Sequence, residues 1–99
     1  AHNIDKALVS YVRCLEFDPH LPNAYSNMGV MYLNAQRPHD AVKVLQVLED
    51  TLQKSSTNDM NNLGDALGDT GRYTDAIAAY DRALDLAQLT TGDRFFPKA

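Results

Sequence analysis

The sequence is poor in the features that mark secreted, membrane-spanning and nucleic-acid-binding proteins. It has a single cysteine, which excludes an internal disulfide and favours a reducing, cytoplasmic compartment. Its uninterrupted apolar runs are only a few residues long, so we expect no membrane insertion. The formal net charge of -4 and the pI near 5.1 argue against nucleic acid and anionic membranes as partners, because both need clustered cations.

Residues that break regular structure are also scarce. The 99 residues include only five glycines and four prolines, and no segment is of low complexity, so disorder is not expected. Hydrophobic residues make up 44% of a chain that is long enough for one small domain. Because a single compact core is marginal at this size, the stacking of simple units is an attractive alternative.

An internal repeat is the dominant pattern in the sequence. The segment SNMGVMYL (residues 26–33) shares an Asn-apolar-Gly core with NNLGDALG (residues 61–68), 35 residues further on. This period is typical of a helical solenoid, here with two full repeats preceded by the second half of a third. With the offset of 35, Tyr25, Met28, Gly29 and Tyr32 fall on Met60, Leu63, Gly64 and Leu67, and Ala41, Leu45 and Leu48 fall on Ala76, Tyr80 and Ala83; with an offset of 34, Ala41, Leu45 and Leu48 fall back on Ala7, Tyr11 and Cys14.

The apolar positions within each repeat have the spacing of a helix face, i, i+3, i+4 and i+7. Pro38 is expected at the first position of a helix and Ser56 at an N-cap. Gly71 can take the left-handed conformation that ends a helix, and Gln36 must do so in the earlier repeat at some steric cost. We predict an all-α chain with helices at residues 3–17, 22–35, 38–54, 57–70 and 73–89.

The expected domain organisation follows the repeats. We predict one repeat domain over residues 1–90, with a half repeat at 3–19 and full repeats at 22–54 and 57–89. The tail, residues 91–99, does not continue the repeat; its Phe95 and Phe96 either cover an exposed helix face or belong to a disordered segment. Because the chain opens in mid-repeat, we expect the true N-terminus to lie upstream, and targeting cannot be judged.

Small residues are predicted where helices approach closely. Gly29 and Gly64 fall where the two helices of a hairpin meet, and a larger side chain there would push the backbones apart. Cys14 lies on a helix stripe and is expected to be a small packing residue. Its helix lacks a preceding partner, so the stripe with Ala7 and Tyr11 is expected to expose apolar surface to solvent or to another chain.

Residues 58–87 resemble the tetratricopeptide repeat, in which a bulky residue, Leu-Gly and Tyr or Leu precede a Gly-containing turn, Ala, an aromatic residue and Ala-Leu. Residues 23–52 fit the same family pattern with some departures. Residues 4–19 match the second helix of a repeat. The resemblance implies a right-handed superhelical stack of antiparallel helix hairpins. Sel1-like repeats remain an alternative, whereas pentatricopeptide repeats bind RNA through a basic groove that this chain lacks. The matches in residues 58–87 are Met60, Leu63, Gly64, Leu67, Gly71, Tyr73, Ala76, Tyr80, Ala83 and Leu84, and the departures in residues 23–52 are Gln36, Pro38 and Leu48.

No catalytic or cofactor-binding pattern is present. The three histidines, His2, His20 and His39, have no metal-ligand spacing with one another or with Cys14. The segment GDALGDTG lacks the preceding strand and the following Lys-Ser/Thr of a phosphate-binding loop. We therefore expect no metal, no cofactor and no enzymatic activity in these residues.

The family resemblance implies that the first helix of each hairpin lines a concave groove that binds peptides. The side of these helices away from the packed stripe is polar, rich in asparagine and somewhat acidic, which favours a neutral or basic peptide of a protein partner. The predicted groove residues are Asn23, Ser26, Asn27, Val30, Asn34, Asn58, Asn61, Asn62, Asp65 and Asp69.

The family has two specialisations that bear on this groove. Chaperone-binding members hold a peptide's C-terminal carboxylate with Lys, Arg and Asn, and no Lys or Arg lies between Arg13 and Arg37 or between Lys54 and Arg72. O-linked N-acetylglucosamine transferase and importin-like solenoids instead use a ladder of asparagines. Asn27 and Asn62 match the ladder position, where an amide can bond both the N–H and the C=O of an extended peptide. The alternative is that both are ordinary polar residues that wet the groove.

Three functional hypotheses follow. The first is a protein-interaction scaffold that binds an extended peptide in the groove. The second is a self-assembling module that stacks end to end or exchanges repeats as a homo-oligomer. The third is a set of substrate-recruiting repeats in a larger enzyme, such as a glycosyltransferase.

Overall fold

A computed structural model describes residues 2–91 of the chain and the side chains of residues 5–88. This part of the chain is helical and contains no strand, which confirms the predicted all-α fold. The predicted role of Phe95 and Phe96 lies outside the described residues. The elements are α1 (His2–Phe17), α2 (Pro22–Asn34), α3 (Pro38–Gln46), the π-helical segment η1 (Val47–Leu52), α4 (Thr57–Asp69) and α5 (Tyr73–Thr91).

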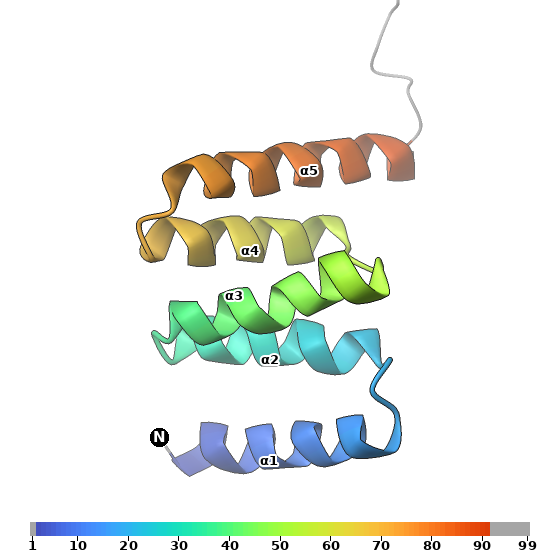
Figure 1. The fold of residues 1–99 in the computed structure, drawn as a ribbon, viewed down its shortest axis with the longest axis vertical. Helices are drawn as coiled ribbons and strands as arrows, with labels where there is room; N and C mark the ends of the chain where they lie inside the picture. The colour runs from blue at the N-terminus through green and yellow to red at the C-terminus, as the bar shows by residue number, and fades with distance from the viewer. Residues whose placement is uncertain (1, 92–99) are drawn as a thin grey trace, which may run out of the picture.

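The helices stack side by side into an elongated body of 53 × 31 × 20 Å (Figure 1). Successive helices run antiparallel, so that α2 with α3 and α4 with α5 form two hairpins. Helix α3 also packs against α4, which joins the hairpins, and α1 packs against α2. The result is the solenoid of helix hairpins expected from the repeat.

The second helix of the first full repeat differs from the prediction. One continuous helix was expected over residues 38–54, but α3 ends at Gln46 and a π-helix follows. Leu48 lies in this wider segment and is completely buried. Its equivalent one repeat later is Ala83, where α5 remains α-helical. We attribute the wider turn to Leu48, because its side chain needs more room between the helices than alanine does.

Both hairpin turns contain the predicted left-handed residue. Gln36 has φ 60° and Gly71 has φ 85°, which confirms that glutamine fills the position that glycine occupies in the next repeat. The following arginine in each turn donates its backbone N–H to a helix carbonyl, at 2.8 Å for Arg37 and 2.9 Å for Arg72. These bonds satisfy carbonyls that the end of a helix leaves without a partner.

The predicted helix starts are confirmed. Pro38 is the first residue of α3, where its missing N–H is not needed. Ser56 caps α4 in a reciprocal arrangement: the Asp59 N–H donates to Ser56 Oγ at 3.2 Å, and the Ser56 N–H donates to Asp59 Oδ2 at 2.9 Å. This capping box fixes the point at which the chain enters α4.

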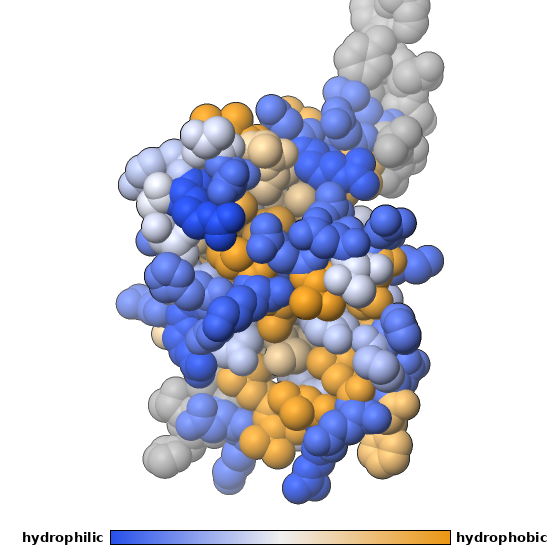
Figure 2. All heavy atoms as spheres, viewed as in Figure 1, coloured by the Kyte–Doolittle hydropathy of each residue, from blue (hydrophilic) through white to orange (hydrophobic). Residues whose placement is uncertain are grey.

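The helix at the N-terminal end of the stack corrects one prediction. Cys14 is exposed and is not a packing residue. The equivalent side chain one repeat later, Leu48, is completely buried inside the stack, whereas α1 packs mainly against α2. Of the stripe that was expected to expose apolar surface, Cys14 is exposed, whereas Ala7 and Tyr11 are half-buried. Other apolar residues of α1 are more exposed: Val9 by 53% and Phe17 by 92%. Figure 2 shows hydrophobic side chains gathered over this end of the molecule.

Candidate functional site

A polar groove runs between α2 and α4. It consists of two adjoining hollows of about 510 and 540 Å³ that share Val30 and Asn62 as lining residues. One hollow joins the N-terminal halves of the two helices and the other joins their C-terminal halves, so α2 and α4 run parallel along the groove. Such a shallow, elongated surface suits a segment of chain better than a compact small molecule.

All ten predicted groove residues line this groove. Six of them are asparagines, and none of the six side-chain amides forms a hydrogen bond within the described part of the chain. These amides are free to donate and accept bonds from a ligand. Asn23, Ser26, Asn27, Asn58 and Asn61 line the N-terminal hollow, Asn34, Asp65 and Asp69 line the C-terminal hollow, and Val30 and Asn62 line both.

The groove also contains residues that the sequence did not predict. Lys54 lines the N-terminal hollow, which corrects the expectation of a groove without cations. It was expected at the end of a helix, but Gln53 has φ 55° and turns the chain after Leu52. Tyr73 and Tyr80 line the C-terminal hollow, and neither was among the predicted groove residues.

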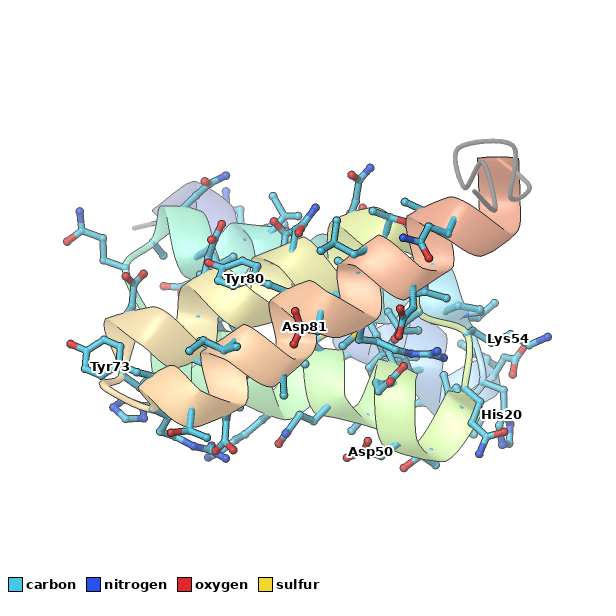
Figure 3. All side chains as sticks on the ribbon, turned by 90° about the horizontal axis from the view of Figure 1, so that it is seen from above. His20, Asp50, Lys54, Tyr73, Tyr80 and Asp81 are labelled. Atoms are coloured by element: carbon cyan, nitrogen blue, oxygen red, sulfur yellow. The ribbon has the colours of Figure 1, made fainter. Side chains whose placement is uncertain are left out.

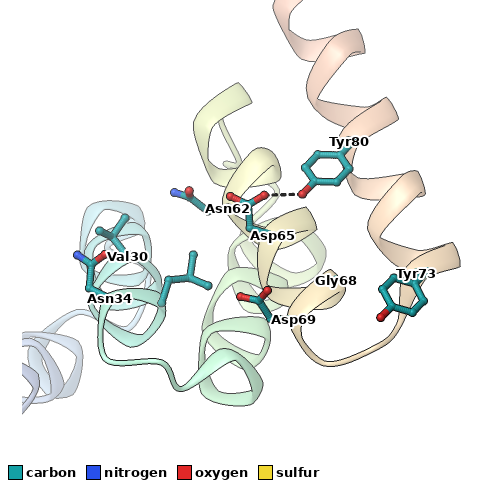
Figure 4. A pocket seen from close by; sticks show the side chains of 9 residues that line it. Val30, Asn34, Asn62, Asp65, Gly68, Asp69, Tyr73 and Tyr80 are labelled. Atoms are coloured by element: carbon teal, nitrogen blue, oxygen red, sulfur yellow. Dashed lines mark hydrogen bonds between the residues drawn. The ribbon is translucent and has the colours of Figure 1, made fainter.

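Tyr80 joins α5 to the groove face of α4 (Figure 4). Its hydroxyl donates a hydrogen bond to Asp65 Oδ1, and its ring lies against Gly64. The hydrogen bond to Asp65, followed by burial and by the negative charges of Asp65 and Asp69, raises the pKa of Tyr80 to about 12. The tyrosine is therefore neutral at physiological pH and holds the Asp65 carboxylate toward α5.

Asp69 has no such partner. Its carboxylate forms no hydrogen bond or ion pair with another described residue, although Arg72 follows it by three residues in the sequence. Arg37 is paired with Asp40 at 2.8 Å, and Arg72 is paired with Asp75 at 2.9 Å. These two ion pairs recur 35 residues apart, a signal present in the sequence as Arg-x-x-Asp after each turn. Asp69 therefore adds an uncompensated negative charge to the groove.

A smaller hollow of about 270 Å³ lies where η1 meets α4 and α5. Its charged residues are largely paired: Arg82 Nε donates to Glu49 Oε2 at 3.2 Å, and Arg72 is held by Asp75. No group of three or more His, Cys, Asp or Glu side chains suited to a metal occurs among the described residues. No helix in this part of the chain is long and apolar enough to cross a membrane. The groove between α2 and α4 thus offers the larger supply of free polar groups.

The comparison with known protein families agrees with the repeated hairpins. Residues 60–96 match the sequence profile of the tetratricopeptide repeat. The match covers α4 from Met60 onward and α5, and it extends past Thr91. No curated protein matches the chain significantly. Tetratricopeptide repeats generally mediate protein–protein interactions. Residues 60–96 therefore contain a tetratricopeptide repeat, and the preceding hairpin, α2 with α3, repeats its close contact and its turn.

Proposed function

We propose that the chain is a protein-interaction scaffold that binds an extended peptide segment of a partner in the groove between α2 and α4. The observation that supports this function is the row of six free asparagine amides on one surface. An extended peptide presents N–H and C=O groups along its backbone, and each side-chain amide can bond one of each. Five of the six asparagines are exposed and Asn62 is half-buried, so the row is accessible to a ligand.

Asn27 and Asn62 are the central residues of this proposal. Each comes directly before the apolar residue and the close-packed glycine of its repeat, which are Met28-Gly29 and Leu63-Gly64. Both asparagines line the N-terminal hollow. The packed glycines hold the two helices at fixed positions, so the two amides are presented in register along the groove. We infer that they form a two-step asparagine ladder for the peptide backbone.

The proposed role is non-enzymatic. Two hydroxyls in the groove lining are bonded to carboxylates, Ser56 to Asp59 and Tyr80 to Asp65. The first bond belongs to the cap of α4 and the second joins the two helices of a hairpin, so both have a structural role. If these repeats accompany a catalytic domain in a longer chain, the same groove would recruit the substrate for that domain.

The test is a fluorescence-polarisation titration with a degenerate pool of neutral, end-blocked nine-residue peptides. The wild type is compared with the double variant Asn27→Ala, Asn62→Ala and with the control variant Gln88→Ala, an exposed amide on α5 outside the groove. Each lost asparagine should weaken binding several-fold, since a net hydrogen bond contributes about 0.5–1.5 kcal/mol. The double variant should show both losses. Equal affinities for all three proteins, with intact helicity, would refute the ladder.

Self-assembly is the second candidate, and the exposed end faces favour it. Helix α5 exposes Tyr73, Ile77 and Leu84 by 69%, 62% and 61%, and α1 exposes Val12 by 46%. Each end could pack against another copy, which would bury these side chains. Sedimentation across a concentration series separates the candidates, because only self-assembly predicts a mass that rises with concentration.

A further inference from the structure

We propose that the groove is electrically polarised along its length and selects an extended peptide with a basic side chain and an acidic side chain a few residues apart. The basic side chain, arginine or lysine, would occupy the C-terminal hollow beside Asp65 and Asp69. The acidic side chain would lie at the other end, near Lys54. This inference rests on the proposed peptide-binding function and adds the class of peptide.

The C-terminal hollow is negative for two separate reasons. Asp65 and Asp69 both line it, and Asp69 has no partner among the described residues. The hollow also lies at the C-terminal ends of α2 and α4, where the helix dipoles are negative, and neither helix has a basic residue in its last turn. A carboxylate at the negative end of a helix is unfavourable until a cation approaches. The nearby arginines do not supply that cation, because Arg37 and Arg72 are held by other aspartates.

The shape of this hollow suits a long cationic side chain. Figure 4 shows Asp65 and Asp69 on α4 between the α2 residues Val30 and Asn34 and the tyrosines of α5. Tyr73 and Tyr80 line the same space with aromatic rings, which attract a cation at their faces. The Val30 side chain offers apolar contact to the methylene groups of lysine or arginine. The hollow therefore combines charge with a lining that fits the stem of the side chain.

The N-terminal hollow has the opposite sign. Lys54 lines it and forms no ion pair in the part of the chain that the structure describes. The first turns of α2 and α4 open into the same hollow, with the positive ends of their dipoles. The one carboxylate in the lining, Asp59, is 7% exposed and is bonded to Ser56 in the capping box. Figure 3, which looks along the stack, shows Lys54 and Tyr73 on opposite sides of the molecule.

The distance between the two ends sets the spacing in the peptide. Asn58, in the first turn of α4, lines the N-terminal hollow together with Lys54 and marks that end of the groove. Asp65 follows Asn58 by seven residues, and Asp69 follows it by eleven. At a helical rise of 1.5 Å per residue these steps span about 10 and 16 Å. An extended peptide covers about 3.3 Å per residue, so its two charged side chains should be about three to five residues apart.

The experiment uses degenerate pools of nine-residue peptides with blocked ends, which removes the terminal charges. One set of pools carries a fixed Arg and a fixed Glu, separated by two to seven residues and in both orders. The comparison pools carry two Arg, two Glu or no charge. Each pool is titrated by fluorescence polarisation at low salt against the wild type, Asp69→Asn and Lys54→Gln. Two control variants, Asp81→Asn and Lys43→Gln, remove the same charges from exposed positions that line neither hollow.

The expected result is that Arg/Glu pools with the spacing of three to five bind more tightly than the neutral, two-Arg and two-Glu pools. Each correctly placed charge should contribute about two- to fivefold at low salt and less at high salt. Asp69→Asn should remove the contribution of Arg and leave that of Glu, and Lys54→Gln should do the reverse. The control variants should retain both contributions.

Two outcomes would overturn the inference and can be told apart. If the neutral pool binds but charged pools bind no more tightly, or if Asp81→Asn weakens them as much as Asp69→Asn, the groove is not polarised and the peptide-binding function stands. If no pool binds at all, both the proposed function and this inference fail.

Discussion

The ring of Tyr80 lies over Gly64 so closely that a Cβ at Gly64 would be 2.5 Å from Tyr80 Cε1. One repeat earlier, a Cβ at Gly29 would be 2.6 Å from Leu45 Cδ2. Real Cβ atoms do not come this close, so each glycine is the position where the two helices of a hairpin touch. The same contact fixes the position of the asparagine two residues before each glycine, Asn27 in α2 and Asn62 in α4.

Gly64→Leu should therefore destabilise the fold. The larger side chain overlaps the Tyr80 ring, and overpacking of this kind costs about 1–3 kcal/mol or more. Gly68→Ala is the matched control, because nothing lies within 4 Å of an added Cβ there and alanine favours a helix. Urea unfolding should show a large loss for the first variant and none for the second. Equal stability of Gly64→Leu and the wild type would contradict the close approach.

The hairpin turns allow a reciprocal exchange of residues. Gln36 has φ 60°, a conformation that costs a residue with a side chain about 1–2 kcal/mol, whereas glycine adopts it freely. Gln36→Gly should stabilise the chain, and Gly71→Gln should destabilise it by about the same amount. Thermal unfolding of both variants measures the effect. A loss of stability in Gln36→Gly would show that its side chain contributes more than the strained backbone costs.

The hydrogen bond between Tyr80 and Asp65 should make stability depend on alkaline pH. The pKa of Tyr80 is about 12 in the folded chain, above its ordinary value of 10.0, because of the bond to Asp65, burial and two nearby carboxylates. The folded state thus holds this proton more tightly than the unfolded state does, and the resulting stabilisation is complete below pH 10 and lost as the pH rises toward 12. The free energy of unfolding should fall more steeply in this range for the wild type than for Tyr80→Phe. Parallel curves for the two proteins would contradict this linkage.

Ser56→Ala should weaken the start of α4. The change removes the Oγ that caps the Asp59 N–H, and loss of such a cap costs about 0.5–2 kcal/mol. It also removes the Oγ–H donor to a carboxylate that is 7% exposed. Ser56→Thr keeps the hydroxyl and serves as the control. If both variants lose the same stability in urea unfolding, the capping box is not the cause.

Much of the fold could be predicted because the repeat copies local chemistry as well as pattern. Gln36 and Gly71 share a turn conformation although their side chains differ, and only the 35-residue alignment relates them. The helix starts, Pro38 at the first position of α3 and Ser56 at the cap of α4, are likewise local signals that packing did not override. The family resemblance placed the groove on the first helix of each hairpin, and the periodicity then selected the residues that lie off the packed stripe.

What the sequence did not predict depends on the space between elements. The π-helical segment Val47–Leu52 has no counterpart in α5, although the two helices share the repeat pattern, so no local pattern encodes it. Lys54 enters the groove because the preceding helix ends at Leu52, earlier than its sequence suggests. Cys14 is on the expected stripe, but its exposure depends on which helices pack against α1.

The most direct test of the account is where a peptide contacts the chain. Nuclear magnetic resonance of the side-chain amides, recorded while the neutral peptide pool is added, observes Asn27 and Asn62 themselves. The account predicts that these two amide signals shift on saturation, together with the neighbouring groove residues, while Gln88 on α5 does not shift. Shifts confined to the exposed face of α5 or to the hollow beside Glu49 and Arg82, with no change at Asn27 and Asn62, would contradict it.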